Sequence, residues 1–572
     1  MYFPQLSTPR QSRVTVSRFL GLDRRPRGQE GSFREMENLC ADGYPALTVR
    51  RPRGVAGSAA SPGGLTVKDG LIWVDGHTLY INGSAAGLAL SEGRKQLISM
   101  GAWLLIWPDK AYINTKDLTD FGSLENKRVT EGEVSFALCR PDGTVYSGYL
   151  AADEAPEEPE AGSLWLDTGG DETALRQYGE DGWTAVDDVC VRMNAAGIGI
   201  GFTAGDGIAV SGCRETDLNG SFPLRSVEDD YVVVTALPRS LSSQSDPVTV
   251  ERSVPDMDYV VESGNRLWGC KYGIVNGQAV NAIYASKLGD FKNWNCYAGL
   301  STDSYAASRG SDGAFTGAAD YLGNPLFFKE NCVERVYPSA SGAHQIVTVQ
   351  CAGVKSGSSG SLRVVDGKLY YHSQGGVCVF DGSMPVHVSQ ALGEMRYHNA
   401  VAGALDGSYY LSAADENGAW HLLVLDTRQG LWYREDGVEA VGFAPWGGDL
   451  YCLTAAGQLL AMKGSGENRE GPVQWLAETG ELGLDAPESR YLVRLSLRLL
   501  PEADSTVRAW VSYDEGGSWQ PAGSLCGVGR LRACTMHVRP RRCRQLRLRL
   551  TGQGGCRIYS LSAVYEMGSD GP

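Results

Sequence analysis

The chain has 572 residues, of which 42% are hydrophobic and 21% are charged, and its formal net charge is -15. This composition excludes a disordered polymer and indicates a globular protein of about two to four domains. An acidic chain is also a poor candidate for wrapping nucleic acid, because binding to phosphates needs clustered lysines and arginines.

Glycine and aromatic residues are abundant, with 73 glycines, 26 tyrosines and 13 tryptophans. Many glycines with many aromatics are typical of short strands joined by tight turns, and no long segment has apolar residues at helical spacing. The fourteen cysteines include no C-x-x-C pair, residues 1–14 lack the apolar region of a secretory signal, and no apolar run would span a bilayer. We therefore expect free thiols, folding in a reducing cytoplasm, and no membrane partner.

A short unit recurs along the chain: a turn with Gly, Asp or Asn, a strand of aromatic and aliphatic residues, and a second turn. Each unit predicts a hairpin with alternating apolar residues. The clearest examples are 69–83, 264–273, 323–337, 366–382, 406–426 and 447–462.

The spacing of these units points to the fold class. Gly323, Gly367, Gly407 and Gly448 head successive units that are 44, 40 and 41 residues apart. A period of about 40 to 50 residues with several short strands is typical of β-propeller blades, which bury one another by radial stacking. We predict an all-β protein with a propeller of about 6–8 blades. An array of β-sandwiches is the alternative.

Two segments interrupt the repeat. Residues 151–189 carry twelve acids and one arginine, and we interpret them as a small acidic insertion module; residues 239–249 (RSLSSQSDPVT) form a polar linker. Trp165, Tyr178 and Trp183 in the module could stack on a sugar ring. Alternatively, these three aromatics form the small hydrophobic core of the module, which we favour.

The C-terminal region predicts a separate domain. Its strands RYLVRLSLRLL, STVRAWVSYD and CRQLRLRLTG alternate strictly, which is typical of a half-buried antiparallel sheet in a sandwich. The predicted organisation has six parts: an N-terminal arm with first strands (1–54), propeller blades (55–150), the acidic insertion (151–189), further blades (190–463), a linker (464–488) and a C-terminal β-sandwich (489–572).

One motif in this last domain matches the Asp-box pattern S-x-D-x-G-x-x-W of sialidases and related propellers. Ser512, Asp514, Gly516 and Trp519 form it. An aspartate there can accept backbone N–H bonds across a hairpin turn, glycine permits a positive φ, and tryptophan packs beneath. We interpret the motif as a folding device and not as a catalytic group.

Other catalytic and metal-binding signatures are absent from the sequence. It contains no G-x-S-x-G, no H-E-x-x-H and no G-x-x-x-x-G-K-[ST], and its seven histidines are scattered. A sialidase would need several Asp-boxes and an arginine triad. We therefore predict no enzyme activity, no catalytic residues, no metal site and no cofactor, with a propeller glycoside hydrolase as a minor alternative.

Positive charge gathers near the C-terminus, where residues 490–557 hold thirteen arginines and four acids. A solvated sheet face would account for these arginines. A docking surface for an acidic partner is the alternative, and it would include Arg539, Arg541, Arg542 and Arg544.

Three stretches of the chain resemble propeller proteins of tailed bacteriophages, the nozzle or DNA-stabilisation proteins attached below the portal of short-tailed phages. The stretches are FLGLDRRPRGQEGSFREMENLCADGYPALTVRRPRG (19–54), IYASKLGDFKNWNCY through LFFKENCVERVY (283–337) with the following GKLYYHSQGGVCVFDG, and RPRRCRQLRLRLTGQGGCRIYSLSAVYEMGS (539–569). The insertion, with GSLWLDT, LRQY and DGWTAV, looks like a small module of phage tail proteins.

This resemblance implies a virion structural protein that continues the DNA exit channel of the tail as a ring of identical subunits. It implies a homo-hexamer that contacts the portal or adaptor and anchors tail fibre or tail-tip proteins, while phage DNA passes without specific binding. A tail-tip or fibre-associated protein that binds a receptor or glycan could share the same blades and is the alternative.

Overall fold

The structure is a computed structural model that describes residues 11–170, 172–297, 299–466, 468–482, 490–513 and 518–567. Strands dominate it, which confirms the all-β prediction. The helical elements of these residues are three single 3₁₀ turns, η1 (Thr216–Leu218), η2 (Ser359–Ser361) and η3 (Gln390–Leu392). The chain divides into two compact units, which are described separately.

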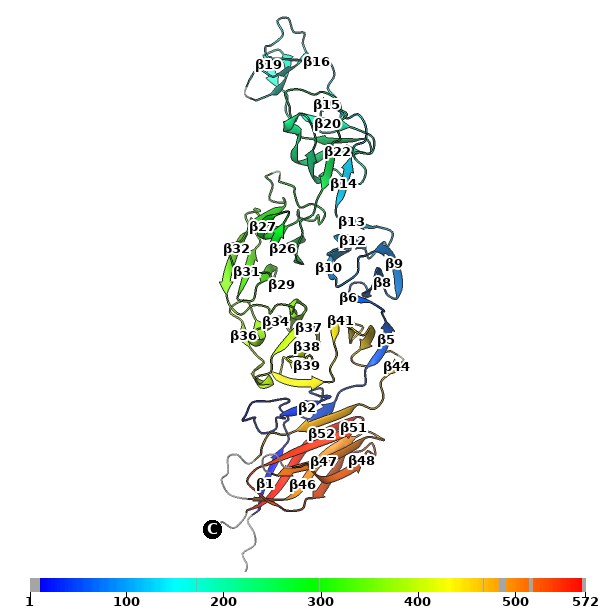
Figure 1. The fold of residues 1–572 in the computed structure, drawn as a ribbon, viewed down its shortest axis with the longest axis vertical. Coiled ribbons are helices and arrows are strands. Elements are labelled where there is room, and N and C mark those ends of the chain that lie inside the picture. Colours follow the sequence, from blue (N-terminus) through cyan, green and yellow to red (C-terminus); the bar gives the residue numbers. More distant parts are fainter. Residues whose placement is uncertain are drawn as a thin grey trace, which may run out of the picture. The chain divides into compact units, whose positions relative to one another are not determined.

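Unit 1 combines Met1–Lys95, Phe328–Val333 and Val349–Pro572. It contains four antiparallel sheets in which consecutive strands pair as blades (Figure 1). Their strands are β6 (Pro62–Val67), β7 (Leu71–Asp75), β8 (Thr78–Ile81), β9 (Ser84–Ala89); β33 (Arg363–Val365), β34 (Lys368–Ser373), β35 (Gly376–Phe380), β36 (Val386–His387); β37 (Tyr397–Leu405), β38 (Ser408–Asp415), β39 (Trp420–Asp426), β40 (Leu431–Glu435); and β41 (Ala440–Trp446), β42 (Asp449–Thr454), β43 (Gln458–Ala461).

The last of these blades is completed by the N-terminal part of the chain. Strand β5 (Gly54–Ser58) pairs antiparallel with β43, and the short β44 (Asn468–Arg469) pairs with β5. Strand β41 also packs against β37 and β6, the first strands of the sheets on either side. The residues after the N-terminal arm thus close the blade formed some 400 positions later, which the sequence units alone did not indicate.

Unit 2 combines Gln96–Phe327 and Glu334–Thr348. It holds two further blade sheets and most of a third. Their strands are β10 (Gln96–Met100), β11 (Trp103–Trp107), β12 (Ala111–Asn114), β13 (Phe121–Ser123); β25 (Tyr259–Ser263), β26 (Arg266–Val275), β27 (Gln278–Ala285), β28 (Tyr305–Ser308); and β29 (Gly317–Tyr321), β30 (Asn324–Phe328), β31 (Cys332–Tyr337), β32 (Gln345–Gln350). Seven blade sheets in the described residues fall within the predicted range of six to eight.

The glycines that head the sequence units occupy the same place in four blades. Each one lies in the turn between the first and second strand, and each has a positive φ. In two of these turns an Asp–Gly pair supplies both central residues: Asp366 and Gly367 have φ of 45° and 77°, and Asp406 and Gly407 have 50° and 76°. Two successive left-handed residues match the twist of a β-hairpin, which confirms the hairpin prediction for these units.

A larger insertion than expected separates β13 from β25. It spans β14 to β24 and forms a seven-stranded sheet in the order β14-β24-β21-β22-β23-β20-β15. These strands are β14 (Asn126–Val129), β15 (Ser135–Cys139), β20 (Cys190–Asn194), β21 (Gly207–Ser211), β22 (Gly220–Glu228), β23 (Tyr231–Val234) and β24 (Thr249–Arg252). The sequence analysis assigned these strands to blades because they alternate apolar and polar residues as blade strands do. Such alternation shows that one face of a strand is buried, but it does not show which strand is its partner.

The acidic module is nested within this insertion. Its four-stranded sheet consists of β16 (Tyr149–Ala152), β17 (Leu164–Asp167), β18 (Ala174–Gly179) and β19 (Gly182–Ala185), and its first two strands run parallel. The short strands expected for residues 151–189 are present. The polar stretch 239–249 lies inside the insertion, where Gln244 is buried and its backbone exchanges hydrogen bonds with Val134.

The C-terminal domain is a sandwich of two sheets that recruits strands from the N-terminus (Figure 1). One sheet holds β1 (Gln11–Val16), β3 (Leu39–Cys40), β4 (Leu47–Val49), β46 (Arg490–Pro501), β49 (Arg532–His537), β50 (Arg542–Cys543) and β52 (Cys556–Met567). The other holds β2 (Glu35–Glu37), β45 (Gln474–Glu478), β47 (Thr506–Tyr513), β48 (Gln520–Cys526) and β51 (Leu546–Gln553). The expected boundary at 489 is therefore too late, since β45 lies in the predicted linker 464–488 and β1 to β4 lie in the predicted arm.

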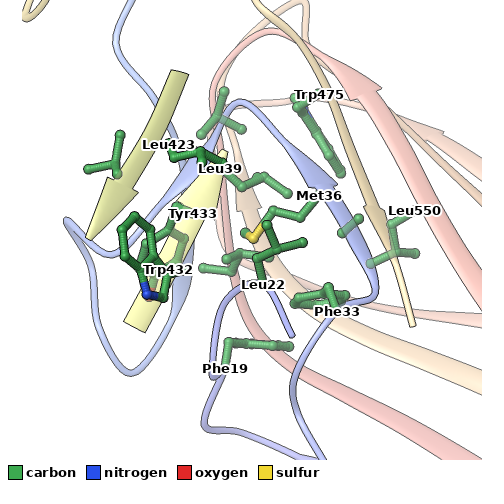
Figure 2. Packing of buried hydrophobic residues seen from close by; sticks show 14 of the residues in the cluster. Phe19, Leu22, Phe33, Met36, Leu39, Leu423, Trp432, Tyr433, Trp475 and Leu550 are labelled. Atoms are coloured by element: carbon green, nitrogen blue, oxygen red, sulfur yellow. The ribbon is translucent and has the colours of Figure 1, made fainter. Parts of the chain in front are cut away.

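The N-terminal segment also packs within the largest hydrophobic cluster of unit 1. Figure 2 shows side chains of this segment beside blade residues of β39 and β40 and sandwich residues of β45 and β51. The labelled side chains are Phe19, Leu22, Phe33, Met36 and Leu39 of the segment, Leu423, Trp432 and Tyr433 of the blade, and Trp475 and Leu550 of the sandwich. Because one continuous core contains all three parts, residues 19–39 join the sandwich to a blade.

Candidate functional surfaces

The Asp-box lies at the end of β47, and part of it can be placed. Ser512 is fully buried in that strand, whereas Asp514 and Gly516 lie outside the described residues. Trp519 is half-buried, and the guanidinium of Arg549 lies 3.9 Å from its ring centroid. Arg549 also forms an ion pair with the buried Glu478 at 2.7 Å. Trp519 thus covers an ion pair of the sandwich, which fits a structural role for this residue.

The four arginines of the predicted docking surface lie together between β49 and β51. Arg539, Arg541, Arg542 and Arg544 are all exposed. The intervening Cys543 is buried and pairs, as part of β50, with Arg490 of β46. The hydroxyl of Tyr513 donates to the backbone oxygen of Arg539 at 3.1 Å, which fixes the start of this segment. The structure therefore brings these four charges together at the surface of the sandwich, around β50.

The three aromatics of the acidic module pack against one another. Trp165 is only 7% exposed, and its Nε1 donates to the backbone oxygen of Ala152 at 2.9 Å. The ring of Trp183 contacts Trp165 edge to face at 5.5 Å and contacts Tyr178 at 5.3 Å between centroids. The burial of Trp165 supports the small-core interpretation that the sequence favoured, because a buried indole offers no open face for a sugar ring.

A buried ion-pair network that the sequence did not reveal ties the N-terminal segment to the rest of unit 1. Arg50 is 4% exposed at its side chain and contacts three carboxylates: Asp436 at 2.6 Å, Glu435 at 3.9 Å and Glu470. Asn38 accepts a hydrogen bond from Nε of Arg50 at 2.7 Å. The Arg-Pro-Arg run at 51–53 was the one sequence signal of a cluster of positive charge. The network could not be predicted from it, because the acidic partners lie about 400 residues away.

The described part of the chain holds no candidate metal site. The residues that the structure describes contain no group of three or more His, Cys, Asp or Glu side chains that could hold a metal ion. The same residues form no helix long and apolar enough to cross a membrane. Burial raises the pKa of Cys139 to about 12 and that of Cys452 to about 12, so neither thiol is a ready nucleophile at neutral pH.

His372 of β34 is a buried group whose protonation opposes folding. Its Nδ1 lies 3.2 Å from the hydroxyl of Ser358, and burial, followed by the nearby Lys355 and His398, lowers its pKa to about 4. The unfolded chain binds a proton at this histidine near pH 6.5, whereas the folded chain does so only near pH 4. The stabilising effect of neutral His372 is therefore present above pH 6.5 and is lost as the pH falls towards 4.

We expect His372→Gln to reduce the loss of stability between pH 7 and pH 4 by about 2–3 kcal/mol relative to wild type. Urea denaturation at both pH values measures this difference. His77→Gln is the matched control, because the side chain of His77 is 66% exposed. Equal pH dependence in all three proteins would show that protonation of His372 does not limit stability.

Comparisons with known proteins show similarity at the level of fold. No family model matches the chain, and none of the curated proteins matches it. PorZ, a surface component of the type-IX secretion system of Porphyromonas gingivalis, is 11% identical over 87% of this chain and 82% of its own, with a TM-score of 0.25. BamB from Moraxella catarrhalis is 9% identical over 66% and 95%, with a TM-score of 0.23.

A sialidase of Trypanosoma rangeli is also similar, with 10% identity over 98% of this chain and 96% of its own, and a TM-score of 0.23. BamB and the sialidase are themselves propellers, as is this chain. At these identities and TM-scores no activity carries over to the chain, and its propeller fold rests on the strand pairing described above.

Proposed function

We propose that this chain is a non-enzymatic structural protein of the tail of a tailed bacteriophage. In this role it forms a nozzle or hub ring that continues the DNA exit channel and anchors other tail proteins. The proposal starts from the sequence resemblance of residues 19–54, 283–337 and 539–569 to such proteins. It needs neither a cofactor nor catalytic residues.

The observation that best supports the proposal is the way residues 19–53 join the sandwich and a blade. This segment, which carries the first part of the resemblance, contributes Phe19, Leu22 and Leu39 to the shared core and Arg50 to the buried ion-pair network. Strand β5 then completes the last blade. A subunit whose sandwich and blade share one core suits a rigid ring, because motion of the sandwich relative to the blade would break buried contacts.

The charge distribution suits passage of DNA through such a ring. With a formal net charge of -15, an acidic channel wall would repel the phosphates, so DNA would pass without sticking. The exposed Arg539, Arg541, Arg542 and Arg544 would then serve contacts between proteins. Six copies are the expected ring, with the portal or adaptor on one side and fibre or tail-tip proteins on the other.

Cryo-electron microscopy of virions that carry this protein tests the proposal. We expect a sixfold ring below the portal with a lumen wide enough for duplex DNA. Localisation of the chain at the distal tip or on fibres would contradict the nozzle position and support the receptor-binding alternative. Absence of the chain from purified virions would contradict the structural role itself.

A further inference from the structure

The outer face of one sandwich sheet carries ordered rows of basic and hydroxyl side chains. In one row, Thr15 of β1, Ser562 of β52, Ser496 of β46 and Thr535 of β49 lie in register across four strands. The hydroxyls of Thr15 and Ser562 are 2.9 Å apart, and those of Ser496 and Thr535 are 3.3 Å apart. Four adjacent strands make a polar strip of about 14 Å.

Arginines lie on both sides of this hydroxyl row. Two residues along the strands, Arg13, Arg494 and His537 occupy the next row of the same face, and Arg498 lies in the row on the opposite side. All four side chains are exposed. We call these four residues, together with the hydroxyl row, the basic face.

The arginines of the basic face are not neutralised by described neighbours. Arg13 donates to the hydroxyl of Ser562 at 3.4 Å, and within the described ranges no acidic side chain forms an ion pair with Arg13, Arg494 or Arg498. The sandwich's own ion pairs, between Glu478 and Arg547 and Arg549, lie on the other sheet. The exposed guanidinium groups, beside the exposed hydroxyls of Thr15 and Thr535, can donate hydrogen bonds to carboxylate oxygens.

The same chain carries the complementary charge in its acidic module. Residues 151–189 hold twelve acids and one arginine, a formal charge of -11. Ten of the acids are exposed, among them Glu157, Glu158 and Glu160 in the loop between β16 and β17. In the described residues the module forms two ion pairs, Asp167 with Arg176 and Asp188 with Arg225. Most of its negative charge is therefore available to a partner.

We propose that the basic face binds the acidic module of a second copy of this chain. The interface joins two different surfaces of one protein, so each copy offers both a donor and an acceptor surface. Such a head-to-tail contact closes into a ring when the rotation between copies allows it. The inference rests on the proposed function for the biological assembly. It deepens that function by naming a second copy of the chain as the partner of the basic face.

Charge reversal of the purified full chain tests the contact. The face variant is Arg13→Glu/Arg494→Glu/Arg498→Glu, and the module variant is Glu157→Lys/Glu158→Lys/Glu160→Lys. Sedimentation velocity over a range of concentrations, at about 50 mM and about 500 mM salt, measures self-association. The control variant, Arg94→Glu/Lys368→Glu/Arg396→Glu, makes the same change in net charge as the face variant, at exposed positions of unit 1 outside the sandwich.

We expect wild type and control to self-associate at low salt, and each test variant to raise the dissociation constant by ~10-fold or more. Mixing the face variant with the module variant should restore association, because acidic faces then meet basic modules and basic faces meet acidic modules. The module variant alone suffices for the test if the face variant does not fold, since the two lie in different units.

Four results would overturn the inference. The first is a wild type that stays monomeric up to ~100 µM at low salt, and the second is association that is unchanged in both test variants. The third is a basic face that binds heparin or DNA but on which self-association does not depend. A change that is independent of protein concentration would place the contact within one chain and also overturn it. A negative result in the self-association test would not contradict a location in the virion. Absence of the chain from virions would contradict the proposed function but not a measured self-association.

Discussion

Arg50→Met is expected to lower the free energy of unfolding of unit 1 by about 3 kcal/mol. Arg50 is buried and holds Asp436, Glu435 and Glu470, which come from the end of a blade and from the segment that leads into the sandwich. Removing the guanidinium leaves these carboxylates close together without their shared cation. The cost stays near the low end for a buried pair because Asp436 and Glu470 are 39% and 34% exposed.

Arg428→Met provides the matched control. Arg428 also pairs with a carboxylate, that of Asp366 at 3.5 Å, but the two side chains are 64% and 48% exposed. We expect this variant to lose less than about 1 kcal/mol, because water screens the exposed pair. Urea denaturation followed by tryptophan fluorescence compares the variants, with hydrogen exchange assigning the transition to unit 1. Equal losses would mean that the buried network does not join the N-terminal segment to the rest of unit 1.

The features that sequence reasoning predicted correctly are those recorded by local patterns. The Asp–Gly turns at 366–367 and 406–407 specify hairpins through their own backbone preferences, and the alternation in 490–500 specifies a strand with one buried face. The period of 40 to 44 residues follows from four strands and their turns. Each of these signals is contained in a few tens of residues, so the fold class could be predicted without knowledge of any partner.

The features that were missed depend on partners distant in sequence. Strand β45 pairs with β51, some 75 residues later, and β2 pairs with β45, some 440 residues later. The seven-stranded sheet of the insertion has the apolar alternation of a blade, and only its strand order distinguishes it. Pairing register depends on which faces meet during folding, and a single sequence does not record that choice.

The same reasoning separates the candidate residues. The Asp-box and the arginines 539–544 stand in contiguous runs, so a scan along the chain detects them. The Arg50 network draws on positions 38, 50, 435, 436 and 470, and the basic face combines Arg13 with Arg494 and His537. The residues of neither group recur at a sequence spacing that would identify the group, because only the tertiary structure brings them together.

The largest expected effect of a single substitution concerns Trp432, whose replacement by alanine should cost about 3–5 kcal/mol in the free energy of unfolding of unit 1. Trp432 is 1% exposed and lies where the N-terminal segment, a blade and the sandwich share one core (Figure 2). Its Nε1 donates to the backbone oxygen of Val388 at 2.8 Å, and its own carbonyl accepts from Leu22 at 2.7 Å. Alanine would leave a cavity and the unpaired oxygen of Val388.

Trp446→Ala is the matched control, because Trp446 also lies in a blade strand of unit 1 but is 43% exposed. We expect it to lose less than about 1 kcal/mol. If residues 19–39 are the joint between blade and sandwich, Trp432→Ala should also raise the rate of limited proteolysis at 24–31, whereas Trp446→Ala should not. A Trp432→Ala protein that is as stable and as protease-resistant as the control would show that the shared core is not what holds the two parts together. The rigidity on which the proposed ring subunit depends would then need another source within unit 1.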